Sequence, residues 1–320
     1  GMSVSNALSL LGYDVTIVER APMLGGKVCV LHHPFPGIGS GMDLLASMID
    51  QIKEGPHIHV KTSLTLESWR FDGSQGLAEL SDGTAIRADA MVLATGLEEV
   101  PPSLIPEYGH GLKSGVLTTS ELEEMLSKGK SPIVVEARSV VFIQCVGSRT
   151  ERRGVPHCST YCCTSSVKNA LLLKNEDPSR EVTVLYIDLR TAGPEQEALY
   201  REARCRGVRF IRGQPSLVME QEGKLLVCGE NTLLRELYEI PADLVVLATG
   251  LRPCSSNSIM FDDLHIKAGP TGFPEKNATP RNRVFLAGSV KRPMMMEEAI
   301  RDARAAALDV HEHLTRREDG

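Results

Sequence analysis

Hydrophobic and polar positions alternate along this chain with helix-like and strand-like periods in turn, which is typical of α/β proteins. Residues 1–12 have a helical period and end at a glycine, and residues 13–20 alternate as a strand that ends in an acidic residue. Together they predict the second half of a βαβ nucleotide-binding unit. The first strand and the glycine loop of such a unit do not precede this helix, so we expect a truncated N-terminus or an internal start.

An internal repeat indicates two units of the same kind. Residues 88–96, A-D-A-M-V-L-A-T-G, match residues 242–250, A-D-L-V-V-L-A-T-G, and both segments predict a buried strand that ends in a small-residue turn. We therefore expect two Rossmann-like nucleotide-binding domains in an α/β fold, with the second inserted into the first. The expected boundaries are 1–111 for the first part, 112–252 for the inserted domain and 253–320 for the C-terminal part.

The remaining periodic segments complete this plan. Helices are predicted over residues 42–52, 120–126, 165–174, 195–206 and 296–314. Strands are predicted over residues 57–61, 64–71, 139–144, 182–186, 208–211 and 282–289, with hairpins over residues 76–87 and 216–240.

Bulk composition limits the possible partners. The chain has 320 residues and a net charge of −6, which argues against nucleic-acid partners and against anionic membrane surfaces. No apolar run reaches the roughly 18–20 residues that a membrane span needs, and no signal peptide opens the chain. The sequence therefore predicts a cytoplasmic protein without a membrane span.

Four of the eight cysteines lie within nineteen residues, at Cys145, Cys158, Cys162 and Cys163 in the pattern C-x12-C-x3-C-C. The first follows a predicted buried strand and the last two open a predicted helix, so the four thiols can gather around a strand-to-helix turn. Such clustering indicates metal or redox chemistry rather than a disulfide framework. Adjacent cysteines bond the separate irons of a cubane more easily than one zinc ion, which favours a four-iron cluster.

Three alternatives for this group remain open. A four-thiolate zinc site usually uses paired C-x2–4-C hooks, which this pattern lacks. His157 is a possible alternative ligand, although a space-filling neighbour is the simpler interpretation. The four cysteines can also be buried structural residues, the interpretation that we prefer for the scattered Cys29, Cys205, Cys228 and Cys254.

Candidate nucleotide contacts follow the predicted strands. Glu19 lies at a strand end where an acid can bind a ribose diol, or it is a surface residue that caps the strand. Gly25 and Gly26 allow close approach of a ligand, or form an ordinary tight turn. Residues 144–149 stand where a second glycine loop belongs, so a pyridine-nucleotide site in the inserted domain is disfavoured, and Arg149, Arg152 and Arg153 are expected to be solvated charges.

The sequence resembles the heterodisulfide reductase A subunits, a family of iron–sulfur flavoproteins. The resemblance is carried by residues 145–149, C-V-G-S-R, by His157-Cys158 and Tyr161-Cys162-Cys163, and by residues 188–191, 200–210 and 242–250. It implies a glutathione-reductase-like fold, an FAD-dependent oxidoreductase, and electron transfer between flavin and iron–sulfur clusters. The implied partners are other redox subunits, B/C-like or quinone-linked, and a homodimer is possible; no residue stands out as a general acid or base.

The resemblance also assigns residues. It implies that Cys145, Cys158, Cys162 and Cys163 ligate one [4Fe–4S] cluster, and that FAD is bound by Glu19, Arg20, Gly25, Gly26, Lys27, Ala94, Thr95, Gly96, Gly288 and Ser289. The chain departs from the family pattern, because it lacks the first strand, most of the glycine loop and ferredoxin-type cysteine segments.

Two other functions fit parts of the sequence. A pyridine-nucleotide-dependent disulfide oxidoreductase needs a C-x-x-C or C-x4-C pair beside the flavin, and no such pair lies near Gly25. A non-catalytic scaffold with a structural zinc is consistent with the missing glycine loop.

Overall fold

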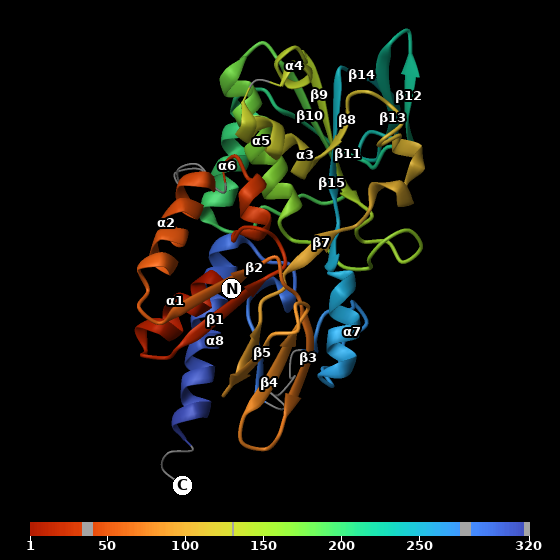
Figure 1. Cartoon of the computed structure of the whole chain (residues 1–320). Coiled ribbons are helices and arrows are strands. Elements are labelled where there is room, and N and C mark those ends of the chain that lie inside the picture. Colours follow the sequence, from red (N-terminus) through yellow and green to blue (C-terminus); the bar gives the residue numbers. More distant parts are fainter. Residues whose placement is uncertain (34–40, 130, 276–282, 317–320) are drawn as a thin grey trace. The chain divides into compact units, whose positions relative to one another are not determined.

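The computed structural model describes residues 1–33, 41–129, 131–275 and 283–316 (Figure 1). These residues form two compact units: unit 1 comprises residues 1–29, 41–98, 252–275 and 283–316, and unit 2 comprises residues 30–33, 99–129 and 131–251. The structure places residues 99–111 with unit 2, whereas the sequence boundary stood at 111/112. The reason is Tyr108, which is buried in the core of unit 2 and donates its hydroxyl hydrogen to Pro215 O at 2.9 Å.

Unit 2 is built on a five-stranded parallel sheet with the strand order β11-β10-β9-β15-β8. Three antiparallel strands, β12-β13-β14, form a second sheet. The strands are β8 (Val116–Thr118), β9 (Ser139–Val146), β10 (Glu181–Tyr186), β11 (Arg209–Arg212), β12 (Leu217–Gln221), β13 (Lys224–Asn231), β14 (Glu236–Ala242) and β15 (Leu244–Thr249). The helices are α3 (Thr119–Lys128), α4 (Pro132–Val135), α5 (Cys162–Glu176) and α6 (Pro194–Cys205).

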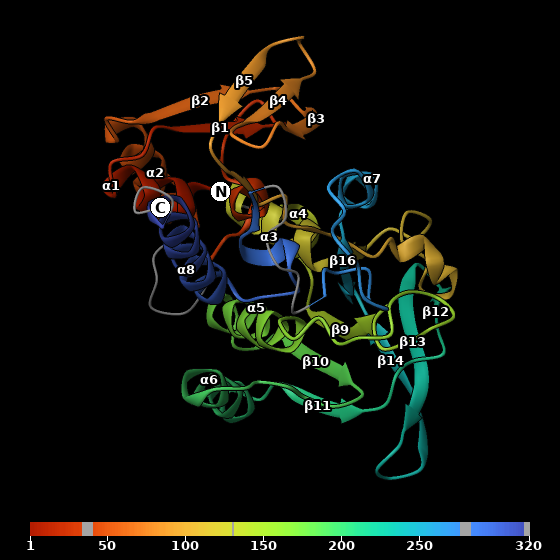
Figure 2. The same cartoon turned by 90° about the horizontal axis from the view of Figure 1, so that it is seen from below.

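The central strands of unit 2 are buried on both faces, which explains their continuous apolar runs. Alternate residues of β9 point to opposite layers: Val140 and Phe142 pack with α3, α5 and α6, while Val141 and Ile143 pack with the β12-β13-β14 sheet. Figure 2 shows α5 and α6 on one side of β9 and β10, and β12, β13 and β14 on the other. The helix α3 begins with a capping box between Thr118 and Glu121.

Unit 1 contains shorter strands in three separate sheets. Strands β1 and β2 pair in parallel, β17 and β6 pair in parallel, and β3-β4-β5 form an antiparallel meander. The strands are β1 (Val15–Glu19), β2 (Ile58–Thr62), β3 (Leu66–Phe71), β4 (Gly76–Leu80), β5 (Ala85–Ala88), β6 (Met91–Leu93) and β17 (Val284–Leu286). The helices are α1 (Met2–Leu10), α2 (Gly41–Glu54), α7 (Ser255–Asp263), α8 (Met296–Thr315) and the 3-10 turns η1 (Gly26–Val30) and η4 (Gly288–Val290).

The main segment of unit 2 is entered through β7 (Leu97–Glu99) and left through β16 (Leu251–Pro253), and the turns η2 (Pro102–Leu104) and η3 (Pro106–Tyr108) follow β7. The α/β fold class and the insertion of one unit into the other agree with the sequence prediction. Helix α7 was not predicted, because its residues show no helical apolar period. None of the described helices is both long and apolar enough to cross a membrane.

Candidate functional site

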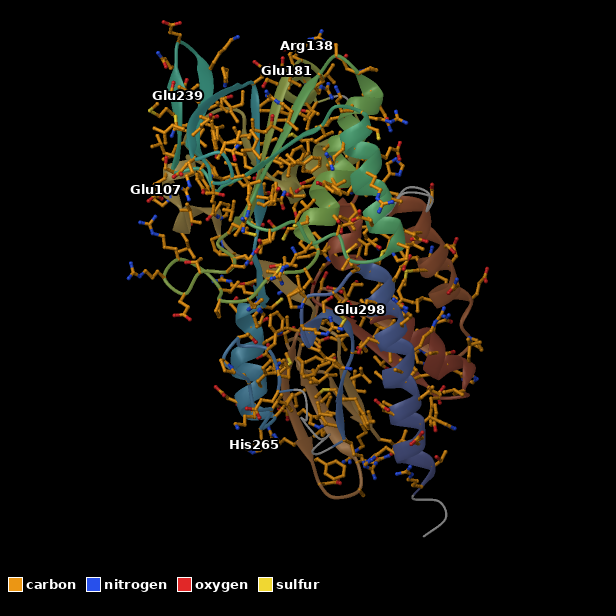
Figure 3. The ribbon with its side chains drawn as sticks, turned by 180° about the vertical axis from the view of Figure 1, so that it is seen from behind. Glu107, Arg138, Glu181, Glu239, His265 and Glu298 are labelled. Atoms are coloured by element: carbon orange, nitrogen blue, oxygen red, sulfur yellow. The ribbon has the colours of Figure 1, made fainter. Side chains whose placement is uncertain are left out.

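The four clustered cysteines belong to elements that meet at the carboxyl edge of the parallel sheet in unit 2. Cys145 is the penultimate residue of β9, Cys158 lies in the following loop, and Cys162 and Cys163 open α5. Three of them are buried, and Cys158 is half-buried. In Figure 3 the labels Arg138 and Glu181 mark the amino ends of β9 and β10, which is the edge opposite to the cysteines. Ligand sites of open α/β sheets lie at the carboxyl edge.

The loop between β9 and α5 is fixed by its own backbone. Ser148 N donates to Cys145 O at 3.1 Å, and Val155 N donates to Gly147 O at 3.0 Å. A Cβ atom on Gly154 would lie 2.0 Å from Gly147 O, so only glycine fits where the two segments of the loop touch. The loop therefore holds its shape through contacts within the chain.

Three residues of this segment have left-handed backbone conformations without being glycine: Cys145 with φ 59°, Arg149 with φ 61° and Thr160 with φ 59°. Such conformations cost of order 1–3 kcal/mol each and gather at functional sites. At Thr160 this conformation lets the backbone N–H donate to Cys158 Sγ at 3.3 Å. The local strain is thus coupled to the placement of two of the thiols.

Burial governs the ionisation of these thiols. It raises the pKa of Cys145 to about 11, and the neighbouring Cys163 and Cys158 add to the shift. Burial also raises the pKa of Cys162 well above its usual value, with further contributions from Cys163, Cys145 and Cys158. Burial also has the largest effect on Cys163 and raises the pKa of its thiol, and the neighbouring Cys158 raises it further. The four thiols are therefore close enough to influence one another, and burial disfavours the thiolate form of Cys145, Cys162 and Cys163. A metal ion reverses that preference, since it binds the thiolate.

Zinc and a four-iron cluster need different arrangements of thiols. Among the described residues, no group of three or more His, Cys, Asp or Glu side chains converges as it must to hold a single metal ion. A zinc ion needs four donors at about 2.0–2.3 Å from one point. A four-iron cluster needs four thiols that each reach a separate iron, so its ligands stand further apart.

Cationic side chains surround the cysteines, which the sequence interpretation missed. Arg149 was expected to be a solvated charge, but the structure places its guanidinium beside Cys145 and Cys158, paired with Asp188 at 2.7 Å. Arg190 opposes the rise in the pKa of Cys163. The thiol of Cys163 lies 3.8 Å from Asp188 O. No period or motif in the sequence distinguishes Arg149 from its exposed neighbour Arg152. The third arginine, Arg153, forms an ion pair with Glu107.

A buried polar network lies behind Cys162. Its thiol is 3.5 Å from Thr249 O, and the hydroxyl of Thr249 donates to Glu99 Oε2 at 2.8 Å. Ser120 donates to the other oxygen of the same carboxylate. Burial raises the pKa of the phenol of the neighbouring Tyr161 well above the usual value, with contributions from Cys162 and Glu99.

In unit 1, the candidate flavin residues lie at the carboxyl ends of the parallel strands. Glu19 ends β1 and accepts a hydrogen bond from Ala21 N at 2.9 Å, so one of its oxygens already caps the strand. A Cβ atom on Gly25 would lie 2.5 Å from Cys29 Sγ, which shows that this glycine is required by packing. By contrast, Cβ atoms on Gly26 and Gly96 would meet nothing within 4 Å, so both border open space.

Several of the candidates converge on Cys254, which sequence reasoning had classed as structural. Cys254 Sγ lies 3.6 Å from Thr95 O. Burial has the largest effect on this thiol and raises its pKa, while the positive charges of Arg20 and Lys27 oppose the rise. Arg20, Lys27 and Thr95 thus lie close together, as expected for a site that binds an anionic cofactor.

The remaining candidates are engaged within unit 1. Gly288 N donates to Asp302 Oδ2 at 2.7 Å, and Lys291 Nζ pairs with the same carboxylate at 2.9 Å. Ser289 lies in η4, and Ala94 packs beside the core formed by α1 and α8. The backbone N–H of Gly288 is therefore not available to a phosphate in this arrangement.

Comparison with known proteins identifies the relatives of this chain. It is 38% identical over 248 residues to the iron-sulfur A subunit of the CoB–CoM heterodisulfide reductase of Methanocaldococcus jannaschii, a match that covers 70% of this chain and 37% of that protein. It is 36% identical over 248 residues to the A subunit of the H2/formate:CoB-CoM heterodisulfide,ferredoxin reductase of Methanococcus maripaludis, with 70% and 37% covered.

The chain is a relative of the heterodisulfide reductase A subunits. It spans a little over a third of the length of these heterodisulfide reductase proteins. A scan against protein-family models gave no match.

Solved structures show the same fold as this heterodisulfide reductase relative. Thioredoxin reductase of Lactococcus lactis aligns with a TM-score of 0.68 at 17% identity, covering 99% of this chain and 96% of the other. Thioredoxin reductase of T. acidophilum aligns with a TM-score of 0.67 at 16% identity, covering 98% and 95%. The NAD-dependent persulfide reductase of A. fulgidus aligns with a TM-score of 0.61 at 17% identity, covering 97% and 56%. The fold is therefore that of the two-domain flavoprotein reductases.

Proposed function

We propose that this chain is the electron-transfer part of a heterodisulfide-reductase-like complex, with FAD in unit 1 and one [4Fe–4S] cluster in unit 2. The observation that carries the proposal is the group of four coupled thiols at the carboxyl edge of the unit 2 sheet, in a chain related to proteins named as iron-sulfur subunits. In this role Cys145, Cys158, Cys162 and Cys163 bind one iron each, and other redox subunits supply or receive the electrons.

The protein's contribution is placement and electrostatics. The bound groups supply the electron chemistry: flavin exchanges two electrons or one, and the cluster exchanges one. Burial of Cys145, Cys162 and Cys163 keeps water from the thiolates, while Arg149 provides positive charge beside them. In unit 1 the open space at Gly26 and Gly96, together with the charges of Arg20 and Lys27, would accommodate an anionic cofactor. The second carboxylate oxygen of Glu19 is the proposed partner of a ribose hydroxyl.

The test of the cluster combines metal analysis with cysteine variants. Protein purified without oxygen, or reconstituted with iron and sulfide, should carry about four irons and four sulfides per chain and absorb broadly near roughly 400 nm, with bleaching on reduction. Replacing Cys145, Cys158, Cys162 or Cys163 by Ser should abolish that absorbance, whereas Cys228→Ser, in β13, should leave it unchanged. One zinc per chain, without sulfide, would refute the cluster and support the zinc scaffold.

The flavin is tested on the same samples. FAD titration should quench flavin fluorescence with a stoichiometry of about one per chain. Lys27→Gln and Glu19→Gln should weaken binding, while Glu67→Gln on the antiparallel meander should not. If all three variants bind FAD as the unchanged chain does, the proposed location in unit 1 is wrong.

A further inference from the structure

Asn257, in the first turn of α7, has a buried side-chain amide without a partner. Its exposed fraction is 0%, and neither Oδ1 nor Nδ2 has a hydrogen-bond partner among the described residues. Buried amides are normally hydrogen-bonded, because a buried donor or acceptor that stays unpaired costs free energy. The side chain therefore indicates a bound group that offers both an acceptor and a donor.

Asn257 belongs to the face of α7 that packs on the β17-β6 pair. Phe261 and Leu264 follow it by four and seven residues, the spacing that places side chains on one face of a helix. Both are buried in one cluster with Leu93 of β6 and Val290 of η4. The amide of Asn257 thus continues an apolar face, where water is a poor source of hydrogen bonds.

The first turn of α7 lies at the carboxyl end of β6. Asn257 N donates to Cys254 O at 2.8 Å, and Cys254 Sγ lies 3.6 Å from Thr95 O, two residues beyond the end of β6. Strands β6 and β17 are parallel, so their carboxyl ends meet at one edge. Ligands of α/β sheets bind at that edge, and the unpartnered amide stands beside it.

The surroundings of the amide fit an anionic cofactor with polar rings. The positive charges of Arg20 and Lys27 act on Cys254, and Gly96, next to Thr95, borders open space. FAD has two planar ring edges that present a donor beside an acceptor, the imide of the flavin and the amino edge of adenine. A carboxamide can pair with such an edge through two hydrogen bonds, as asparagine does with adenine in nucleic acids.

We propose that the side-chain amide of Asn257 binds FAD by pairing with one of these ring edges, and that it contributes to the choice of cofactor. The inference rests on the proposed FAD site in unit 1 and adds to it a residue of α7. Asn257 has no part in proton or electron transfer. Its amide lowers the stability of the FAD-free protein, and bound FAD supplies the missing hydrogen bonds.

The test uses one substitution with two readouts. Asn257→Leu keeps the branching of the side chain but removes the unpaired donor and acceptor, so it should not lower the urea midpoint of the FAD-free protein. The same variant should bind FAD at least about tenfold more weakly, because two hydrogen bonds are lost. Trp69, which packs against the same cluster, reports unfolding by fluorescence, and quenching of flavin fluorescence reports binding. Ser256→Leu, at an exposed position of the same helix, should change neither.

Asn257→Ala, which adds no volume, decides the outcome if Asn257→Leu unfolds more easily. Tenfold weaker FAD binding by Asn257→Ala then supports the proposal, and equal affinity overturns it. If the unchanged chain binds no FAD, the proposed flavin site fails, and the role of Asn257 fails with it. If the unchanged chain and Asn257→Ala bind FAD equally, only the role of Asn257 fails.

Competition with FMN and with ADP identifies the ring edge. Each is titrated against bound FAD in the unchanged chain and in Asn257→Ala. A loss of affinity confined to FMN supports pairing with the flavin imide, and a loss confined to ADP supports pairing with adenine. Equal affinities of the two proteins for both competitors would overturn the pairing with a ring edge.

Discussion

Arg149 donates a hydrogen bond from Nη2 to Asp188 Oδ2 at 2.7 Å, and its guanidinium lies beside Cys145 and Cys158. A hydrogen bond from the Arg149 side chain opposes the rise in the pKa of Cys145 that burial causes. The guanidinium is therefore placed to stabilise a thiolate at Cys145, the form in which this residue would bind the proposed cluster.

We expect Arg149→Gln to lower the reduction potential of the cluster by roughly 50 mV or more, because a positive charge a few Å away favours the more negative, reduced state. Potentiometric titration followed by electron paramagnetic resonance measures the shift. Arg152→Gln, an exposed arginine of the same loop, serves as the control. Equal potentials in the two variants would show that Arg149 does not act on the cluster.

The rate of alkylation in the metal-free protein should distinguish buried from exposed cysteines. Iodoacetamide reacts with thiolates, so the buried Cys145, with a pKa raised to about 11, should react slowly at pH 8 and faster as the pH approaches 11. The exposed Cys205 should react first. Mass spectrometry of digests taken over time gives both rates. If Cys145 reacts as fast as Cys205 at pH 8, the thiol is not buried as described.

Lys168 and Glu123 form a buried ion pair in unit 2, with side-chain exposures of 6% and 1%. Burial lowers the pKa of Lys168, and Glu123 opposes that shift. Glu123 also accepts hydrogen bonds from Asn169 Nδ2 at 2.9 Å and His32 N at 3.0 Å. Lys168→Met should destabilise the protein by about 3–5 kcal/mol, because it leaves a carboxylate buried without its cation.

The double variant Lys168→Met with Glu123→Leu should lose less free energy of unfolding than the sum of the losses in the two single variants. Urea unfolding followed by circular dichroism measures all four members of the cycle. Additive losses would mean that the two side chains do not interact.

Acid should weaken the turn after β3. Asp72 accepts hydrogen bonds from Gln75 N, Ser74 N and Ser74 Oγ, which together lower its pKa to about 2. Since the folded pKa lies below the unfolded value of 3.8, the stabilisation is fully present above about pH 4 and disappears as the pH falls towards 2. Asp72→Ala should therefore lower the urea midpoint at pH 6 and have a much smaller effect at pH 2.

The single tryptophan, Trp69 in β3, reports this unfolding by fluorescence. Ser74→Ala keeps the Asp72 carboxylate but removes one hydrogen-bond donor to it. This variant should therefore lower the urea midpoint by less than Asp72→Ala over the same pH range. A loss for Asp72→Ala that is constant from pH 6 to pH 2 would contradict the assigned role of the carboxylate.

Periodic segments gave most of the fold in advance, because buried strands such as Ser139–Val146 and the amphipathic Met296–Thr315 carry their burial pattern in the sequence. Helix α7 was not foreseen, because its residues carry no helical apolar period. The placement of the four cysteines around the end of β9 followed from the predicted strand and helix. The positions of Arg149 and Cys254 could not be predicted in this way, because contacts with residues far away in the sequence bring them to their partners.

The close contact of Gly154 with Gly147 bears on how a cluster of the proposed kind would be assembled. A Cβ atom at residue 154 would collide with Gly147 O, and backbone hydrogen bonds link the same two segments of the β9–α5 loop. The chain itself thus positions the thiols that would receive the iron. In such an assembly the half-buried Cys158 is the most accessible of the four thiols.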